Sequence, residues 1–268
     1  MKQLFLILVI AFDLFGAVLK SQIISINEEG SEAIVQNEGI EEGVSGFIIH
    51  EIDKDHSVIL KNAVVTSYDK KTGNAKIALS DFNALSNNSL PNGKWKVKVG
   101  DSVLLAFGYA KGVLIAPNEE IYYRITKNSK LQWVHPDLFA TILSYNSHPT
   151  PLRGDFDELS VKSSVGLVFI YLEGRVFTLD AKSFKILTIT DAKLEQKEVN
   201  LPFYTRVPEI DSSWWKFFDE GNRKLKEYEP HYYSLLAKAN PQDKTLYEII
   251  KNGGEKFEDL LKYFKIKE

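Results

Sequence analysis

Short apolar runs separated by turn residues fill the first part of the chain, from Lys20 to about Pro117. Gly, Asp and Asn recur between these runs at short spacing, which is typical of β-strands joined by tight turns. We expect antiparallel hairpins that close into a small barrel or a sandwich, with a surface loop over Asn83–Lys98 before the last strands. The expected strands are Ile23–Ile26, Ala33–Val35, Phe47–Ile49, Val58–Leu60, Ala63–Val65, Lys76–Leu79 and Val103–Ala106.

The hydrophobic period changes after Pro117–Asn118, where apolar residues begin to recur at helical spacing. This change predicts a small α/β domain over 118–192. Phe156 and Leu159 are expected on the buried face of one of its helices, and Glu173–Gly174 at the turn of a hairpin. The expected elements are a helix with Ile121, Tyr122 and Ile125 on one face, a short strand Leu131–Val134, helices opening near Pro136 and Pro151, and strands Val165–Leu172, Arg175–Leu179 and Phe184–Ile189.

The rest of the chain, 193–268, is expected to be a helical C-terminal region. Ser212 or Ser213 is placed to cap a helix that contains the aromatic run Trp214–Phe218, and such a run on an amphipathic helix usually packs in a core. Two more helices are expected over Thr245–Lys251 and Glu255–Phe264. The sequence therefore predicts an α+β protein in which a β-rich domain, 18–117, precedes the α/β domain and the helical region.

The first residues have the layout of a secretory signal peptide. Lys2 precedes the nine apolar residues Leu4–Phe12, and the small pair Gly16–Ala17 offers a cleavage site. Asp13 interrupts the apolar segment, which is then too short for the roughly 20 residues of a membrane-spanning helix. We expect that residues 1–17 are removed, that no stable transmembrane segment is present, and that the protein is exported to the periplasm, the outer membrane or the cell surface.

Composition excludes several classes of function. The chain has 33 basic and 36 acidic residues, interleaved throughout, whereas nucleic-acid binding requires a clustered basic excess. It has no cysteine, which excludes disulfides, thiol nucleophiles and cysteine-ligated metals. We therefore expect no nucleic-acid partner.

Residues that could carry catalytic or metal chemistry are scattered. His50 and His56 flank an acidic turn, but without zincin or EF-hand spacing, so a solvated turn beside one packed histidine is the favoured interpretation. Asp155 and Glu158 fall near a predicted helix start, where the helix dipole stabilises acids. We expect no catalytic residue, no metal and no cofactor; the less favoured alternative is an enzyme that uses Asp155, Glu158 or His135.

An ordered series of short motifs runs through the chain from about Ile23 to near Tyr263–Phe264. The order of the series resembles the N-terminal domain of the PgbA-type plasminogen-binding surface proteins of epsilonproteobacteria, although no single motif is specific. The motifs include Gly43-x-Ser45-Gly46, Asp55-His56-Ser57, Gly100-Asp101-x-Val103, Leu114-Ile115-Ala116-Pro117-Asn118, His135-Pro136-Asp137-Leu138-Phe139-Ala140 and Asp180-Ala181-x-Ser183-Phe184-Lys185.

The resemblance implies an exported, non-enzymatic bacterial envelope protein that binds host plasminogen through exposed lysines. The kringle modules of plasminogen bind a zwitterion, pairing an ammonium with acids and a carboxylate with cations. Lys267, with the carboxylate of Glu268 beside it, is the first candidate, followed by Lys265 and Lys262. The alternative is a periplasmic or outer-membrane-associated scaffold or assembly module that binds an envelope partner and has no role with plasminogen.

Overall fold

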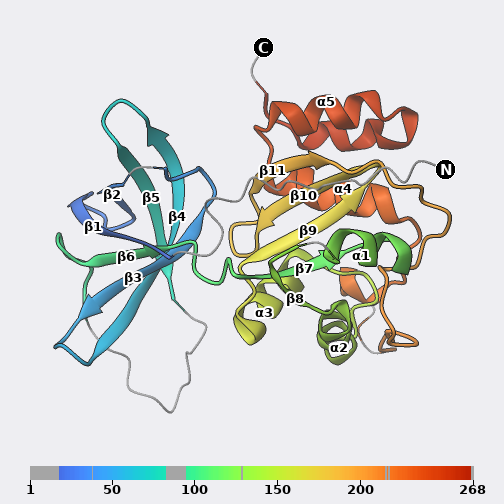
Figure 1. Ribbon diagram of the computed structural model, residues 1–268, viewed down its shortest axis with the longest axis horizontal. Coiled ribbons are helices and arrows are strands. Elements are labelled where there is room, and N and C mark those ends of the chain that lie inside the picture. The colour runs from blue at the N-terminus through green and yellow to red at the C-terminus, as the bar shows by residue number, and fades with distance from the viewer. Residues whose placement is uncertain are drawn as a thin grey trace. The chain divides into compact units, whose positions relative to one another are not determined.

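The computed structural model describes residues 18–37, 39–82, 95–127, 129–214, 216 and 218–266, and the chain divides into two compact units (Figure 1). One unit reaches to Tyr109 and the other begins at Ala110. This division precedes Pro117, where the hydrophobic period changes, because strand β7 (Lys111–Ile115) pairs with strands of the second unit. The expected signal peptide and most of the expected loop over 83–98 lie outside the described residues.

A closed antiparallel barrel of six strands forms the first unit, so the barrel alternative is confirmed. Its strand order is β1-β2-β5-β4-β3-β6, and β1 pairs with β6 to close it. The two runs expected as separate strands around Leu60 and Val64 are one strand, because the part of β4 that pairs with β3 overlaps the part that pairs with β5. The strands are β1 Leu19–Ile26, β2 Glu32–Gln36, β3 Ser45–Glu51, β4 Ser57–Asp69, β5 Asn74–Asp81 and β6 Ser102–Leu105.

A mixed five-stranded sheet, in the order β11-β10-β9-β7-β8, forms the centre of the second unit (Figure 1). β7 runs parallel to both β8 and β9, whereas β9, β10 and β11 are antiparallel, with the expected turn at Glu173–Gly174. Every residue of β9 is buried, as expected for a strand that is covered on both faces. The remaining strands are β8 Gln132–Val134, β9 Leu167–Leu172, β10 Arg175–Asp180 and β11 Ile186–Asp191.

Two helices of the second unit, α1 and α5, begin at residues whose side chains satisfy free backbone N–H groups. Asn118 caps α1 by accepting from Ile121 N at 2.9 Å, and Asp243 caps α5 by accepting from Leu246 N at 2.9 Å. Phe156 and Leu159 are fully buried, as predicted. The helices are α1 Glu119–Thr126, α2 Pro136–Asn146, α3 Arg153–Ser163, α4 Tyr228–Ala239 and α5 Lys244–Asn252, with 3-10 helices η1 Glu220–Asn222 and η2 Glu255–Tyr263.

The C-terminal helices share one core with the sheet. The hydroxyl of Tyr228 on α4 lies 3.1 Å from the carbonyl oxygens of both Ile115 and Tyr171, which places α4 against β7 and β9. Tyr232 donates to Pro202 O at 2.8 Å. The division into units therefore shows no boundary near residue 192, because α4, α5 and η2 cover the same hydrophobic cluster as α2 and α3.

The prediction of a helix over the aromatic run after Ser213 is wrong. The described residues there form turns and irregular backbone, and Trp214 and Phe218 are 74% and 103% exposed instead of packed in the core. The side chain of Asn222 bonds Ser213 N, Ser213 O and Lys216 O, and these bonds close a loop in place of a helix.

Gly46 permits the close approach of β3 to β6. A Cβ at this position would lie 1.9 Å from Leu104 O, which is backbone and has little freedom to move. We expect Gly46→Ala to lower the free energy of unfolding of the barrel by about 3 kcal/mol or more, measured by urea denaturation. Gly154→Ala on α3, which meets no atom within 4 Å, is the control and should be neutral or slightly stabilising. Equal stability of the two variants would contradict the β3–β6 packing.

His231 on α4 makes the stability of the second unit sensitive to acid. Its Nε2 lies 2.9 Å from Pro151 O, and burial, with the charge of Lys238, lowers its pKa to about 4. Below pH 6.5 the unfolded chain binds a proton that the folded chain excludes, so stability falls as pH drops toward 4. From pH 7 to pH 5 this group should cost about 2 kcal/mol. Between pH 7 and pH 5, His231→Gln, which keeps a hydrogen-bond donor, should lose about 2 kcal/mol less free energy of unfolding than the wild type, measured by urea denaturation. An equal loss in the two proteins would contradict the role given to His231.

Candidate functional site

Two of the three candidate lysines lie on the outer layer of the second unit. Lys262 is exposed near the end of η2, and Lys265 is exposed just after it. Lys267, the first candidate, lies outside the described residues. The site is therefore built from η2 and the helices on which it packs.

The sequence of η2 has the three-residue period of its 3-10 conformation. Phe257, Leu260 and Tyr263 recur at every third position and pack against the hydrophobic cluster of the unit. Phe257 is fully buried, with its ring centroid 4.9 Å from that of Tyr233 on α4. This row, together with Leu261, fixes η2 to the core, and the other two rows carry exposed charged side chains.

One exposed row of η2 consists of Lys256, Asp259 and Lys262. Side chains at i and i+3 of a 3-10 helix lie one above the other, so this row alternates cation, anion and cation. Lys256 Nζ is paired with Glu173 Oε1 at 2.7 Å. No ion pair joins Lys262 or Asp259 to any residue that the structure describes, and Lys262 Nζ lies over the ring of Tyr263, 5.5 Å from its centroid.

Aromatic rings and backbone bonds hold the lysines of this layer in place. The ring of Tyr263 also lies 5.2 Å from Lys238 Nζ, so two ammonium groups share one aromatic ring. Beyond η2, Lys265 N donates to Pro241 O at 2.7 Å, which ties the chain to the turn between α4 and α5. The ammonium of Lys265 is thus displayed from an anchored backbone.

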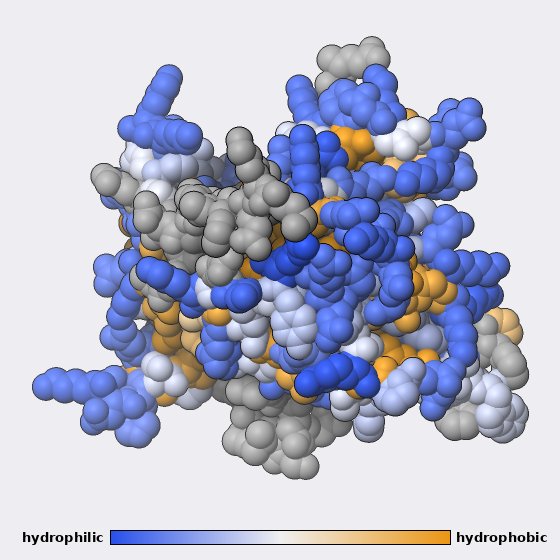
Figure 2. All heavy atoms as spheres, turned by 45° about the vertical axis from the view of Figure 1, so that its right-hand side comes forward, coloured by the Kyte–Doolittle hydropathy of each residue, from blue (hydrophilic) through white to orange (hydrophobic). Residues whose placement is uncertain are grey.

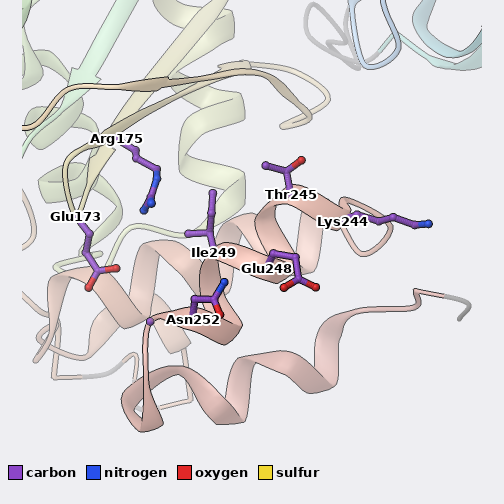
Figure 3. Close-up of a pocket in the computed structure, with 8 residues that line it drawn as sticks. Glu173, Arg175, Lys244, Thr245, Glu248, Ile249 and Asn252 are labelled. Atoms are coloured by element: carbon purple, nitrogen blue, oxygen red, sulfur yellow. The ribbon is translucent and has the colours of Figure 1, made fainter.

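An open groove of about 760 Å³ lies between the β9–β10 turn and α5 (Figure 3). Figure 3 shows Arg175 extending from the turn toward Ile249, while the side chain of Lys244 points away from the groove. Arg175 Nε is 3.7 Å from Asp191 Oδ1, a long separation for an ion pair. Glu173, on the same turn, accepts from Lys256 and from Tyr233 Oη at 3.2 Å, which links this wall of the groove to η2 and α4.

Charged and polar residues dominate the face shown in Figure 2, where apolar residues are visible only in small separate areas. The groove likewise carries both signs of charge, from Arg175 and Lys244 and from Glu173 and Glu248. Such a surface is suited to ionic recognition of a partner, in which individual ammonium and carboxylate groups are paired.

The residues weighed for catalysis have structural roles in the described part of the chain. His135 caps α2, its Nδ1 accepting from Asp137 N at 3.2 Å. Asp155 accepts from Leu152 N at 2.7 Å at the start of α3, and Glu158 pairs with Lys162 at 2.5 Å. Burial lowers the pKa of His135, so it is neutral at pH 7.

The two histidines of the barrel are not brought together. His56 bonds Asp53 within its own exposed turn, whereas His50 Nδ1 lies 2.8 Å from Asp101 Oδ1 on the neighbouring strand edge. Among the described residues no group of three His, Cys, Asp or Glu side chains could hold a metal ion. Nor does any helix in those residues have the length and apolar character to cross a membrane.

Sequence reasoning missed one polar cluster. His148 lies between Asp155 and Asp219, at 2.8 Å from Asp155 Oδ1 and 3.0 Å from Asp219 Oδ2. Asp219 lies 71 residues further along the chain, and no local motif marks this pairing.

Comparisons with known proteins agree with the resemblance found in the sequence. The family model described as "Plasminogen-binding protein pgbA N-terminal" matches residues 18–236. Two curated relatives named Plasminogen-binding protein PgbA, from two strains of Helicobacter pylori, are each 24% identical over 203 residues, which is 75% of this chain and 44% and 43% of the relatives. The chain therefore spans less than half the length of these relatives. No solved structure matches it.

The matched range ends within α4, short of the expected extent to Tyr263–Phe264, so η2 with Lys262 and Lys265 lies beyond it. The range nevertheless includes the described barrel and the whole central sheet. Because it covers well over half of the chain, the protein belongs to the family defined by the N-terminal region of the plasminogen-binding protein PgbA.

Proposed function

We propose that this chain is an exported, non-enzymatic binding protein that captures host plasminogen through exposed lysine side chains. Family membership and the names of the two relatives support the choice of partner. The signal-peptide pattern of residues 1–17 supports export. The choice of the residues that contact plasminogen rests on the geometry of η2.

The observation that carries the proposal is the unpaired Lys262 beside Asp259. A lysine-binding site of a kringle requires an ammonium and a carboxylate presented together. Asp259 and Lys262 lie one above the other on η2, separated by a rise of about 6 Å along the helix axis. Both side chains are exposed, and neither is paired with another described residue. This pair presents the two charges of a zwitterion from an internal position in the chain.

Lys265 is the second lysine of the proposal. It is exposed, and its backbone N donates to Pro241 O, so its ammonium is displayed from an anchored backbone. Lys267 stays a candidate on the strength of its position next to Glu268 in the sequence. Lys256 is excluded from the set, because its pairing with Glu173 fixes η2 to the β9–β10 turn.

A second candidate function, a scaffold module that docks to an envelope protein, is favoured by a different observation. Trp214 and Phe218 are exposed on one loop, and aromatic side chains are enriched in the centres of protein interfaces. Binding to an envelope partner that is abolished by Trp214→Ala, with no plasminogen binding, would favour this candidate over the first.

Replacement of Lys262 tests the plasminogen proposal. Loss of one charge-assisted contact should weaken binding of the full chain to immobilised plasminogen by roughly 10- to 100-fold in Lys262→Ala. Asp259→Asn, which removes the paired carboxylate and keeps the size of the side chain, should weaken it in the same direction. Binding is measured by surface plasmon resonance. A free lysine analogue should displace the wild-type chain, and raised salt should weaken its binding.

Lys130→Ala is the matched control, since Lys130 is exposed in the loop between α1 and β8 and has no acidic residue one turn away. Its affinity should equal that of the wild type. Plasminogen binding that resists the lysine analogue, and that is unchanged in Lys262→Ala, Lys265→Ala and Lys267→Ala, would rule out the lysine mechanism.

A further inference from the structure

A histidine bridges two carboxylates at the base of the loop that carries the exposed aromatic residues. His148 Nδ1 lies 2.8 Å from Asp155 Oδ1, and Nε2 lies 3.0 Å from Asp219 Oδ2. His148 follows α2, Asp155 is in the first turn of α3, and Asp219 directly precedes η1. Two neighbouring segments and one that lies 71 residues further along the chain therefore meet at one imidazole.

Backbone and amide N–H groups also donate to both carboxylates. Asp155 Oδ2 accepts from Leu152 N, and its Oδ1 also accepts from Asn146 Nδ2 at 3.2 Å. Asp219 Oδ1 accepts from Gly221 N at 3.0 Å. Because an ionised carboxylate can only accept, both ring nitrogens of His148 must carry a proton. The bridge in this structure thus requires the imidazolium.

The bridge holds a loop whose described residues are 213, 214, 216 and 218–222, and we call it the Trp214 loop. Asn222 closes it from within, as described above. Three further hydrogen bonds join it to the body of the unit: Ser147 Oγ with Ser213 Oγ at 2.5 Å, Thr150 N with Gly221 O at 3.1 Å, and Lys216 Nζ with Asn146 O at 2.6 Å. Among the described residues, the bond between His148 and Asp219 is the only ion pair between the loop and the rest of the unit.

We propose that His148 is a proton-controlled latch for the Trp214 loop, which binds Asp219 when the ring is protonated and releases it when the proton is lost. A neutral imidazole has a single N–H and can donate to one carboxylate only. Asp155 retains that bond, because its carboxylate is 3% exposed and fixed by two other donors. Asp219 is 32% exposed, so water can replace the imidazole as its hydrogen-bond donor. The unprotonated Nε2 of the neutral ring would then face the carboxylate of Asp219 with a lone pair.

The surrounding charges favour the protonated ring. Burial lowers the pKa of His148, but the hydrogen bonds to Asp219 and Asp155 and their charges outweigh it, so the pKa is raised above 6.5. Glu158 on α3 adds a third nearby carboxylate, and Lys216 on the loop is the cation that faces Asp219. A raised pKa in the folded state means that the stabilisation is complete below pH 6.5 and is lost as pH rises through the folded pKa.

Close packing couples the ring to the loop backbone. A Cβ at Gly221 would lie 2.6 Å from His148 Cγ, so the imidazole rests directly against the η1 backbone. Movement of the ring away from Asp219 therefore alters the segment 219–222, while the bonds of Ser213 and Thr150 keep the loop attached. The expected change is a loosening at one end of the loop that carries Trp214 and Phe218.

Nuclear magnetic resonance on the full chain tests the latch. The ring of His148 should titrate with a midpoint above 6.5. Across that midpoint, protection of the Gly221 and Asn222 amides against hydrogen exchange, corrected for the intrinsic rate, should fall by about tenfold with rising pH. Amides of β9 should keep their protection. Asp219→Asn should lower the midpoint of His148 and make protection of the loop independent of pH.

His56→Gln is the control, since His56 bonds only Asp53 in an exposed turn of the barrel, and it should leave the loop profile unchanged. A His148 midpoint at or below 6.5, or loop protection that stays constant through the His148 titration, would overturn the proposal. If Asp219→Asn does not fold, these two wild-type measurements decide the question.

Discussion

Burial of the central strands on both faces is the constraint on which the second unit depends. β9 is buried at every position and β7 at four of five, so neither strand is stable without cover on each side of the sheet. α2, α3, α4, α5 and η2 supply that cover on one face through a single hydrophobic cluster. On the other face, Trp133 packs on Phe169 at 4.9 Å and Tyr171 bonds Leu194 O. The segment beyond the matched family range is thus part of the core of this unit.

Two histidines place opposite demands on this unit. His231 is stable only as the neutral ring, because it is buried beside Lys238. His148 is stable as the imidazolium, because two carboxylates accept from it. Acid therefore weakens the attachment of α4 while it strengthens the base of the Trp214 loop. The net response to pH is a balance between two local effects of opposite sign.

Local patterns in the sequence were sufficient to predict most helices and strands. They were insufficient where a side chain distant in the sequence determines the backbone conformation. Alternating runs and turn residues identified the barrel strands. Hydrophobic period and the positions of prolines identified the helices that start after Asn118, His135 and Asp243. The aromatic run at Trp214 has helical composition, but the bonds of Asn222 close a loop there. The partners of His148 could not be predicted, because Asp219 is brought to it only by the tertiary fold. The candidate lysines could be chosen from the sequence, but the sequence did not show which lysines form ion pairs in the fold.

The 3-10 conformation of η2 determines which acid can reach Lys262. In an α-helix successive residues turn by about 100°, and Glu258, four positions earlier, would lie within about 40° of Lys262 and form the usual i,i+4 ion pair. In a 3-10 helix the turn is about 120° per residue, which moves Glu258 about 120° around the axis and aligns Asp259 instead. The 3-10 conformation of the nine residues of η2 thus keeps the ammonium of Lys262 away from the carboxylate of Glu258. Any change that rewound η2 as an α-helix would neutralise Lys262 without altering a single charged residue.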